Sequence, residues 1–103
     1  MKKNLVSILI TNFNKSSYLK KTIISCLVQD FKHKEILVFD DCSSDNSLEI
    51  LNKFKKKIKL IKNKKKISTS APLNQINGLI KLFKKSKGEI IFFLDGDDLF
   101  KKK

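Results

Sequence analysis

The sequence predicts an α/β fold in which a mostly parallel sheet carries crossover helices. Short apolar runs alternate with segments whose apolar residues recur at helical spacing, in the order β-α-β-α-β-α-β. The first run, 5–11, is almost continuously apolar, as in strands buried on both faces of a sheet, and the last run, 89–94, is apolar from Ile90 to Leu94. Right-handed crossovers would bring the carboxyl ends of all these strands to one edge of the sheet.

The first helix is expected at 17–29, after a polar loop at 12–16 that contains Phe13. Either Ser16 or Ser17 is expected to cap the exposed amides at its start. Apolar residues at helical spacing define its inward face: Leu19, Ile23, Cys26 and Leu27.

The second strand is expected at 35–40, and it runs directly into a cluster of turn-forming and capping residues at 41–46. That cluster predicts a helix at 47–55, followed by a short strand at 58–61. The inner face of this helix is expected to consist of Leu48, Leu51 and Phe54.

The third helix is expected to open at Pro72, after a polar, Lys-rich loop at 62–71. Gly88 is expected to end the connection to the last strand. The inner face of the third helix is predicted from the 3-4-3 spacing of Leu73, Ile76, Ile80 and Phe83.

Acidic side chains are concentrated after two of the predicted strands. The chain has ten acids, and six of them are Asp40, Asp41, Asp45, Asp95, Asp97 and Asp98. A parallel sheet would bring both groups to one edge, where open sheets of this type bind ligands. Carboxylates packed together need compensating charge, and a bound divalent cation is the simplest source.

The turn Asp95–Gly96–Asp97 suits Mg²⁺ or Mn²⁺, because the intervening glycine lets both carboxylates aim at one point. These ions use one or two protein carboxylates and fill their other positions with water and phosphate oxygens. The turn therefore implies a ligand that carries phosphate. An ordinary solvated Asp-Gly turn has the same pattern, so both interpretations stay open.

Two residues at strand ends are suited to a nucleobase. Asp41 stands several residues ahead of the next helix and could accept the imide N–H of a uracil ring, whereas Asp45 fits an ordinary helix cap. Phe13 offers a stacking face in a polar loop. The alternative for Phe13 is a ring folded back on the core.

Together these motifs resemble family 2 glycosyltransferases of the GT-A fold, whose first half is a Rossmann-like nucleotide-binding unit. The resemblance covers nearly the whole chain in order and spacing. The matching segments are 6–14, 18–19, 25–29, 35–45 and 87–98.

The resemblance implies transfer of a sugar from a nucleotide diphosphate donor, here expected to be a UDP-sugar, with inversion at the anomeric carbon. It places Thr11 and Phe13 beside the nucleoside, although the family usually has Tyr at the position of Phe13. It places Asp41 at the base edge. It assigns Asp95 and Asp97 to the acidic metal motif, with Asp97 as the direct ligand of Mg²⁺ or Mn²⁺ and Asp95 also in contact with the nucleotide. Asp98 is expected to support the turn.

Two departures from the family pattern qualify these expectations. The helix before the last strand carries no Arg near the diphosphate, so Asn74, Gln75 or a loop Lys would take that role. The family's acceptor-binding half, with its catalytic carboxylate, follows the acidic motif and is absent after Asp98. Residues 1–103 are therefore expected to form the N-terminal nucleotide-binding part of a truncated domain that contains no catalytic base. On its own this part would transfer sugar weakly or not at all, as a truncated frame, half of a split enzyme or a remnant.

Composition bears on partners and location. The net charge is +13, and every one of the 23 basic residues is Lys. Proteins that bind nucleic acid usually prefer Arg, so this composition indicates codon bias more than selection for nucleic-acid binding. The two Cys are not spaced like the ligands of a metal site or the cysteines of a disulfide framework. No apolar run is long enough to span a membrane. We expect a cytoplasmic protein, with the Lys excess allowing contact with the inner face of the membrane. The resemblance suggests a glycan or lipid-linked acceptor in polysaccharide biosynthesis.

Three other functions are compatible with parts of the sequence. The segment 53–66 holds nine Lys and could bind nucleic acid or an anionic surface, but aromatic residues are not interleaved with the Lys. A phospho-acceptor receiver domain also has acids at strand ends, but it needs a lone acceptor Asp and a later Lys in a layout that this chain lacks. A non-catalytic interaction module derived from the transferase fold is the third.

Overall fold

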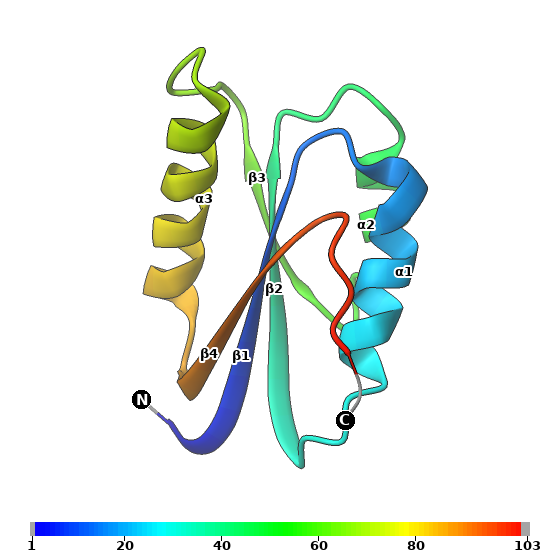
Figure 1. Ribbon diagram of the computed structural model, residues 1–103, viewed down its shortest axis with the longest axis vertical. Helices are drawn as coiled ribbons and strands as arrows, with labels where there is room; N and C mark the ends of the chain where they lie inside the picture. The colour runs from blue at the N-terminus through cyan, green and yellow to red at the C-terminus, as the bar shows by residue number, and fades with distance from the viewer. Residues whose placement is uncertain (1, 102–103) are drawn as a thin grey trace.

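The computed structural model describes residues 2–101, and their elements follow the predicted order. Figure 1 shows a sheet with helices on both of its faces. The elements are β1 (Lys2–Asn12), α1 (Ser16–Leu27), β2 (His33–Asp41), α2 (Ser47–Lys53), β3 (Lys59–Asn63), α3 (Ala71–Lys85) and β4 (Gly88–Asp95).

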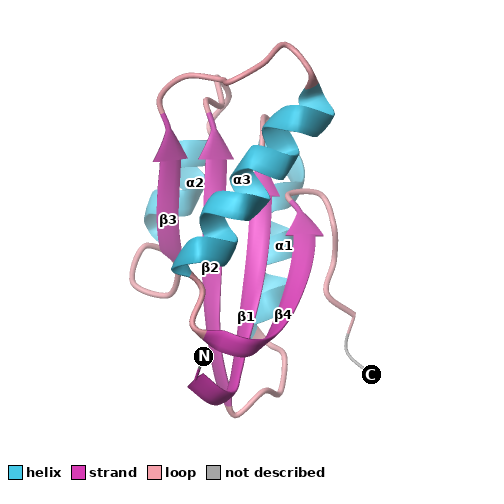
Figure 2. Ribbon diagram, turned by 90° about the vertical axis from the view of Figure 1, so that its left-hand side faces the viewer, coloured by secondary structure: helices cyan, strands magenta, loops and turns pink. Residues whose placement is uncertain are grey.

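The sheet has the strand order β3-β2-β1-β4, and every neighbouring pair of strands is parallel. The helices α1 and α2 cover one face, and α3 covers the other (Figures 1 and 2). The chain moves outward from β1 to β3 and then returns through α3 to place β4 beside β1. This reversal of direction creates a switch point at the carboxyl ends of β1 and β4, where open α/β sheets bind ligands.

The central strands β1 and β2 are buried on both faces because their apolar residues do not alternate with polar ones. Even-numbered residues such as Ile8 and Val38 pack with α1 and α2 in one apolar cluster. Odd-numbered residues, among them Leu9 and Phe39, pack with Leu82 of α3 in a second cluster. The period of two along each strand thus divides the core into two layers.

The predicted inner face of α1 is confirmed. The structure buries Leu19, Ile23 and Cys26 and packs Leu27 against them. The prediction that Ser16 or Ser17 caps α1 is wrong. The side chain of the residue at the N-cap position makes no hydrogen bond to the first turn of the helix. The backbone N–H of Ser16 instead donates to Asp45 Oδ2, at 3.0 Å, from the loop after β2.

The predicted inner face of α3 is wrong. Its expected core residues are about half exposed: Leu73 54%, Ile76 51%, Ile80 49% and Phe83 56%. The helix buries Asn74, Gly78 and Leu82 instead. The ring of Phe39 causes this rotation: it lies so close to Gly78 that a Cβ there would approach its Cδ2 to 2.5 Å. The helix therefore meets the sheet through its smallest residue rather than through its most apolar stripe.

Smaller differences concern the ends of elements. The structure begins β3 at Lys59, after Ile58, and ends α2 at Lys53. Of the predicted inner face of α2, Leu51 is buried, Phe54 is half-buried and Leu48 is exposed. Within residues 2–101, no helix is long and apolar enough to cross a membrane.

Candidate nucleotide site

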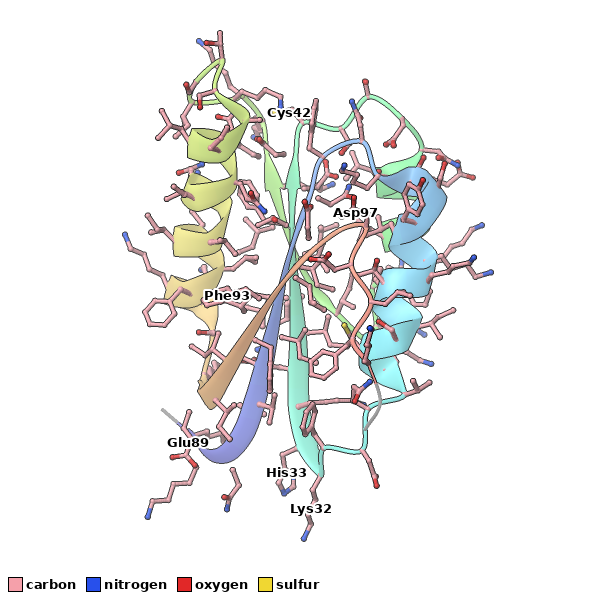
Figure 3. The ribbon with its side chains drawn as sticks, viewed as in Figure 1. Lys32, His33, Cys42, Glu89, Phe93 and Asp97 are labelled. Carbon is pink, nitrogen blue, oxygen red and sulfur yellow. The ribbon has the colours of Figure 1, made fainter. Side chains whose placement is uncertain are left out.

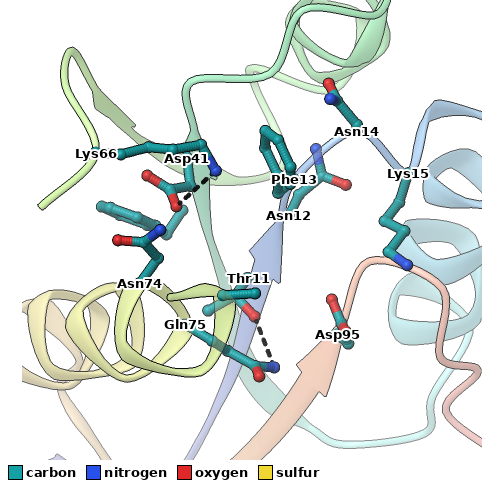
Figure 4. A pocket seen from close by; sticks show the side chains of 12 residues that line it. Thr11, Asn12, Phe13, Asn14, Lys15, Asp41, Lys66, Asn74, Gln75 and Asp95 are labelled. Atoms are coloured by element: carbon teal, nitrogen blue, oxygen red, sulfur yellow. Dashed lines mark hydrogen bonds and ion pairs between the residues drawn. The ribbon is translucent and has the colours of Figure 1, made fainter. Parts of the chain in front are cut away.

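A cavity of about 410 Å³ opens where the carboxyl ends of β1, β2 and β4 meet (Figure 4). Four residues predicted for nucleotide binding line it, although they come from three different strands or their ends: Thr11, Phe13, Asp41 and Asp95. The ends of strands that are distant in the sequence therefore converge on one rim of the sheet, as the sequence predicted.

The end of β1 supplies the aromatic wall. Thr11 is buried, and its Oγ1 accepts a hydrogen bond from Gln75 Nε2 of α3 at 3.5 Å. Phe13 is 41% exposed and lines the cavity, so its ring is not folded back on the core. Phe13 thus presents an aromatic ring at the mouth of the cavity, with the Lys66 ammonium 3.2 Å from the ring centroid.

The neighbouring acids Asp40 and Asp41 have different roles because successive strand residues point to opposite faces. Asp40 is buried and accepts hydrogen bonds from Asn12 Nδ2 at 2.9 Å and Ser43 Oγ at 2.7 Å. Asp41 faces the cavity, where it accepts from Asn63 Nδ2 at 2.9 Å and pairs with Lys66 at 3.6 Å. Asp40 therefore stabilises the loop, and Asp41 is the carboxylate that faces a ligand.

Asp45 caps two helices at once, in agreement with its predicted capping role. Its carboxylate accepts the backbone N–H groups of Ser47, at 2.9 Å, and Ser16, at 3.0 Å. Partial burial opposes its ionisation, but the hydrogen bonds from Ser47 and Ser16 outweigh that effect and lower the pKa of Asp45 from 3.8 to about 2. This acid fixes the rim and is not available to a ligand.

The turn after β4 is built by its own acids. Asp95 Oδ1 accepts from the backbone N–H of Gly96 at 2.7 Å, and Asp98 Oδ2 accepts from that of Asp95 at 2.7 Å. Asp98 thus supports the turn, as the family resemblance implies. A Cβ at Gly96 would lie 2.5 Å from Asn12 Oδ1, so the close approach of the turn to β1 requires glycine.

Two lysines supply part of the charge compensation that sequence analysis assigned to a cation. Lys15 Nζ lies 3.4 Å from Asp97 Oδ2, and Lys66 Nζ lies 3.6 Å from Asp41 Oδ2. Lys66 belongs to the loop that the sequence suggested as a source of charge. Lys15 was not predicted, and its place in the polar loop ahead of α1 was the one available signal.

The carboxylates fit a metal that shares its ligands with a phosphate. Among residues 2–101, no group of three or more His, Cys, Asp or Glu could hold an ion alone. Asp95 lines the cavity and Asp97 is partly exposed in the same turn, so this turn offers two carboxylates, while Asp98 accepts the backbone N–H of Asp95. Mg²⁺ and Mn²⁺ are bound by such sparse sets when phosphate oxygens complete the coordination.

Of the two polar residues proposed to replace a family Arg, only Gln75 is free to reach a ligand. Asn74 is buried, and its side-chain amide makes two hydrogen bonds with the backbone of Ser68. Its Nδ2 donates to the carbonyl at 2.9 Å, and its Oδ1 accepts from the N–H at 3.1 Å. That pair fixes the loop between β3 and α3. Gln75 is exposed and lines the cavity beside Thr11.

The remaining reactive side chains stand apart from this chemistry. Burial raises the pKa of the Cys26 thiol to about 11, and Cys42 donates to the carbonyl of Asn63 at 3.1 Å. His33 is exposed at the start of β2, at the opposite end of the sheet from Asp97 (Figure 3). None of these three is positioned as a nucleophile or base for the cavity.

The chain matches known proteins along nearly its full length. The model of the family described as Glycosyl transferase family 2 matches residues 7–103. The poly(ribitol-phosphate) beta-N-acetylglucosaminyltransferase TarP of Staphylococcus aureus is 39% identical over 98 residues, which are 91% of this chain and 28% of TarP. An uncharacterized glycosyltransferase of Haemophilus influenzae is 37% identical over 95 residues, which are 91% of this chain and 36% of that protein.

Solved structures agree with the sequence matches. The crystal structure of S. aureus TarS 1–349 in complex with UDP has a TM-score of 0.78 at 26% identity, covering 95% of this chain and 29% of that chain. The mannosyltransferase PcManGT from Pyrobaculum calidifontis, in complex with GDP-Man and Mn²⁺, has a TM-score of 0.77 at 17% identity, covering 92% of this chain and 28% of that one. The second similarity shows the fold alone.

The chain spans 17% to 38% of the length of curated relatives that it matches. The match therefore concerns the part of those proteins that this chain contains. On the family model and the structural similarity together, the chain belongs to the family 2 glycosyltransferases and has the α/β architecture of their GT-A fold.

Proposed function

We propose that the chain binds a nucleotide diphosphate-sugar, with a UDP-sugar as the expected donor, as the donor-binding part of an inverting glycosyltransferase. The observation that carries this proposal is the convergence of Thr11, Phe13, Asp41 and Asp95 on one cavity. TarS, a relative of similar structure, was crystallised with UDP. That finding supports a uridine nucleotide as the first ligand to test.

Each lining residue has a chemical role in this proposal. The half-exposed ring of Phe13 stacks on the base. Asp41 accepts the imide N–H of uracil, and its burial under the loop strengthens that hydrogen bond because water is excluded. Lys15 and Gln75 line the same cavity and supply donors toward the diphosphate.

Asp97, with Asp95, would hold Mg²⁺ or Mn²⁺. When bound, the ion supplies positive charge to the leaving diphosphate. Asp97 already attracts one cation, the Lys15 ammonium at 3.4 Å, in a partly exposed position. A metal at this turn would replace that lysine, which would then be free to contact phosphate.

The reaction we propose is a single displacement in which an acceptor hydroxyl attacks the anomeric carbon and the nucleoside diphosphate leaves. Among the described residues we assign no general base, because Asp40 and Asp45 are engaged in structural hydrogen bonds and the cavity carboxylates Asp41 and Asp95 are assigned to the nucleobase and the metal. We place that base, and the site for a glycan or lipid-linked acceptor, outside residues 1–103, in a part corresponding to the length of the relatives that this chain does not match. The isolated chain would then bind its donor and transfer sugar weakly or not at all, in the cytoplasm or at the inner membrane surface.

Isothermal titration calorimetry with UDP, in the presence of Mn²⁺ and of EDTA, tests the proposal. We expect binding that needs Mn²⁺ and that weakens at least tenfold in Asp97→Asn. The matched control is Asp30→Asn, which removes the same charge from an exposed turn at the other end of α1. Absence of metal-dependent heat in the wild type would instead support a non-catalytic interaction module.

A further inference from the structure

The side chain of Lys66 occupies the part of the cavity assigned above to the base. Its Nζ lies 3.2 Å from the centroid of the Phe13 ring and 3.6 Å from Asp41 Oδ2 (Figure 4). It therefore makes a cation–π contact and an ion pair at the same time. Both partners are the groups that a nucleobase would use for stacking and for its hydrogen bond.

The lysine and a base exclude each other from this space. A ring stacked on Phe13 would lie about 3.5 Å from it, at ordinary van der Waals separation. The ammonium already stands at 3.2 Å over the same ring. A base can therefore stack on Phe13 and reach Asp41 only after Lys66 has moved away.

The surroundings allow that movement without a change of the backbone. A second hollow, of about 620 Å³, adjoins the first and shares Phe13 and Lys66 with it. The loop itself is held by the two hydrogen bonds between Asn74 and Ser68. Rotation about side-chain bonds is thus sufficient to carry the Lys66 ammonium out of the cavity while the loop stays in place.

We propose that Lys66 is an internal occupant of the base site, which a nucleotide must displace in order to bind. This inference rests on the proposed function and adds a gate to it, namely the Lys66 side chain, which closes the base site until a nucleotide displaces it. In the free protein the ammonium compensates the buried Asp41 and covers Phe13, so the site is closed and electrostatically satisfied. Binding exchanges that ammonium for the N–H and the ring face of the base.

The test compares Lys66→Ala with Lys65→Ala, which removes the same charge from an exposed neighbour in the loop. The ligand is uridine, which has no phosphate, so the affinity reports the base site without a charge effect. Titration of the isotope-labelled chain, followed by NMR, should give a Kd about three- to tenfold lower for Lys66→Ala than for wild type, the effect of losing one exposed cation–π contact and one ion pair. Lys65→Ala should bind like the wild type.

A second readout follows Lys66 directly. Its ε-methylene protons should resonate upfield in the free protein because they lie over the Phe13 ring, and saturating uridine should return them to ordinary positions. Phe13→Ala should remove the upfield shift without any ligand. Ordinary ε-methylene shifts in the free protein would overturn the gate.

The two proposals fail differently. If the wild type binds UDP with Mn²⁺ but Lys66→Ala binds uridine no more tightly than Lys65→Ala, the gate is wrong and the nucleotide site stands. If neither uridine nor UDP binds to the wild type or to Lys66→Ala, the nucleotide site is wrong and the gate falls with it.

Discussion

At the scale of single residues, the rim separates carboxylates that hold the fold from carboxylates that face a ligand. Asp40 and Asp41 are adjacent in the chain, yet the first bonds only protein donors and the second lines the cavity. The sequence predicted an acidic rim and distinguished Asp41 from the cap Asp45, but it did not assign Asp40 to structural hydrogen bonds. The division depends on which partners the fold brings within hydrogen-bond distance.

Substitution of these two neighbours should separate stability from binding. Asp40→Ala leaves the buried amide of Asn12 and the hydroxyl of Ser43 without their acceptor, and should lower the free energy of unfolding by about 1–3 kcal/mol. Asp41→Asn keeps the shape of the side chain and should leave stability within about 0.5 kcal/mol of wild type while weakening UDP binding about tenfold or more, since one charge-assisted hydrogen bond is lost. Urea unfolding and calorimetry measure the two effects. Equal loss of stability in both variants would contradict the division.

At the scale of elements, Asp45 links α1 and α2 to the rim. Because its folded pKa of about 2 lies below the ordinary value of 3.8, the ionised carboxylate stabilises the fold above pH about 4. That contribution is lost as the pH falls toward 2. Asp45→Ala should lower the free energy of unfolding by about 1–2 kcal/mol at pH 7, and its difference from wild type should shrink between pH 4 and pH 2. A difference independent of pH would show that the cap does not act through its charge.

The orientation of α3 is a second feature of this scale. Its apolar stripe predicted one inward face, but the contact of Gly78 with the Phe39 ring selects another. Gly78→Ala should therefore destabilise the fold by about 1–3 kcal/mol through overpacking, despite the better helix propensity of Ala. A double-mutant cycle with Phe39→Leu checks the cause, because the smaller side chain should restore part of the loss. No recovery in the double mutant would contradict this account of the packing.

These elements show what the sequence could and could not predict. The buried strands, the element order and the acidic strand ends follow from local patterns, because a run such as 5–11 can be satisfied only inside a sheet. The rotation of α3 could not be predicted, since hydrophobic periodicity assumes that the most apolar stripe is covered. The pairing of Lys15 with Asp97 and of Lys66 with Asp41 depends on contacts between segments far apart in the chain.

At the scale of the whole molecule, α3 and β4 leave an apolar face uncovered. Ile76, Ile80 and Phe83 of α3 and Phe93 of β4 are each about half exposed. Exposed apolar side chains gathered on one face favour self-association. Figure 3 shows Phe93 on the α3 side of the sheet.

Substitutions at two adjacent residues of α3 should affect different properties, one the solubility of the chain and the other its stability. Phe83→Ser removes an exposed ring and should raise the solubility of the chain with little effect on unfolding. Leu82→Ala empties a fully buried position and should cost about 2–5 kcal/mol. Light scattering and urea unfolding distinguish the two outcomes. Loss of stability in Phe83→Ser would show that this face is covered in solution.

The central claim is that carboxylates from β2 and β4 share one nucleotide and one metal at a common rim. Paramagnetic broadening by Mn²⁺ in the NMR spectrum of the full chain tests it most directly. With UDP present, we predict selective loss of signals at 11–15, 41 and 95–98, while His33 at the opposite edge stays sharp. Broadening spread over surface acids such as Asp30 and Glu49, unchanged by UDP, would contradict the claim.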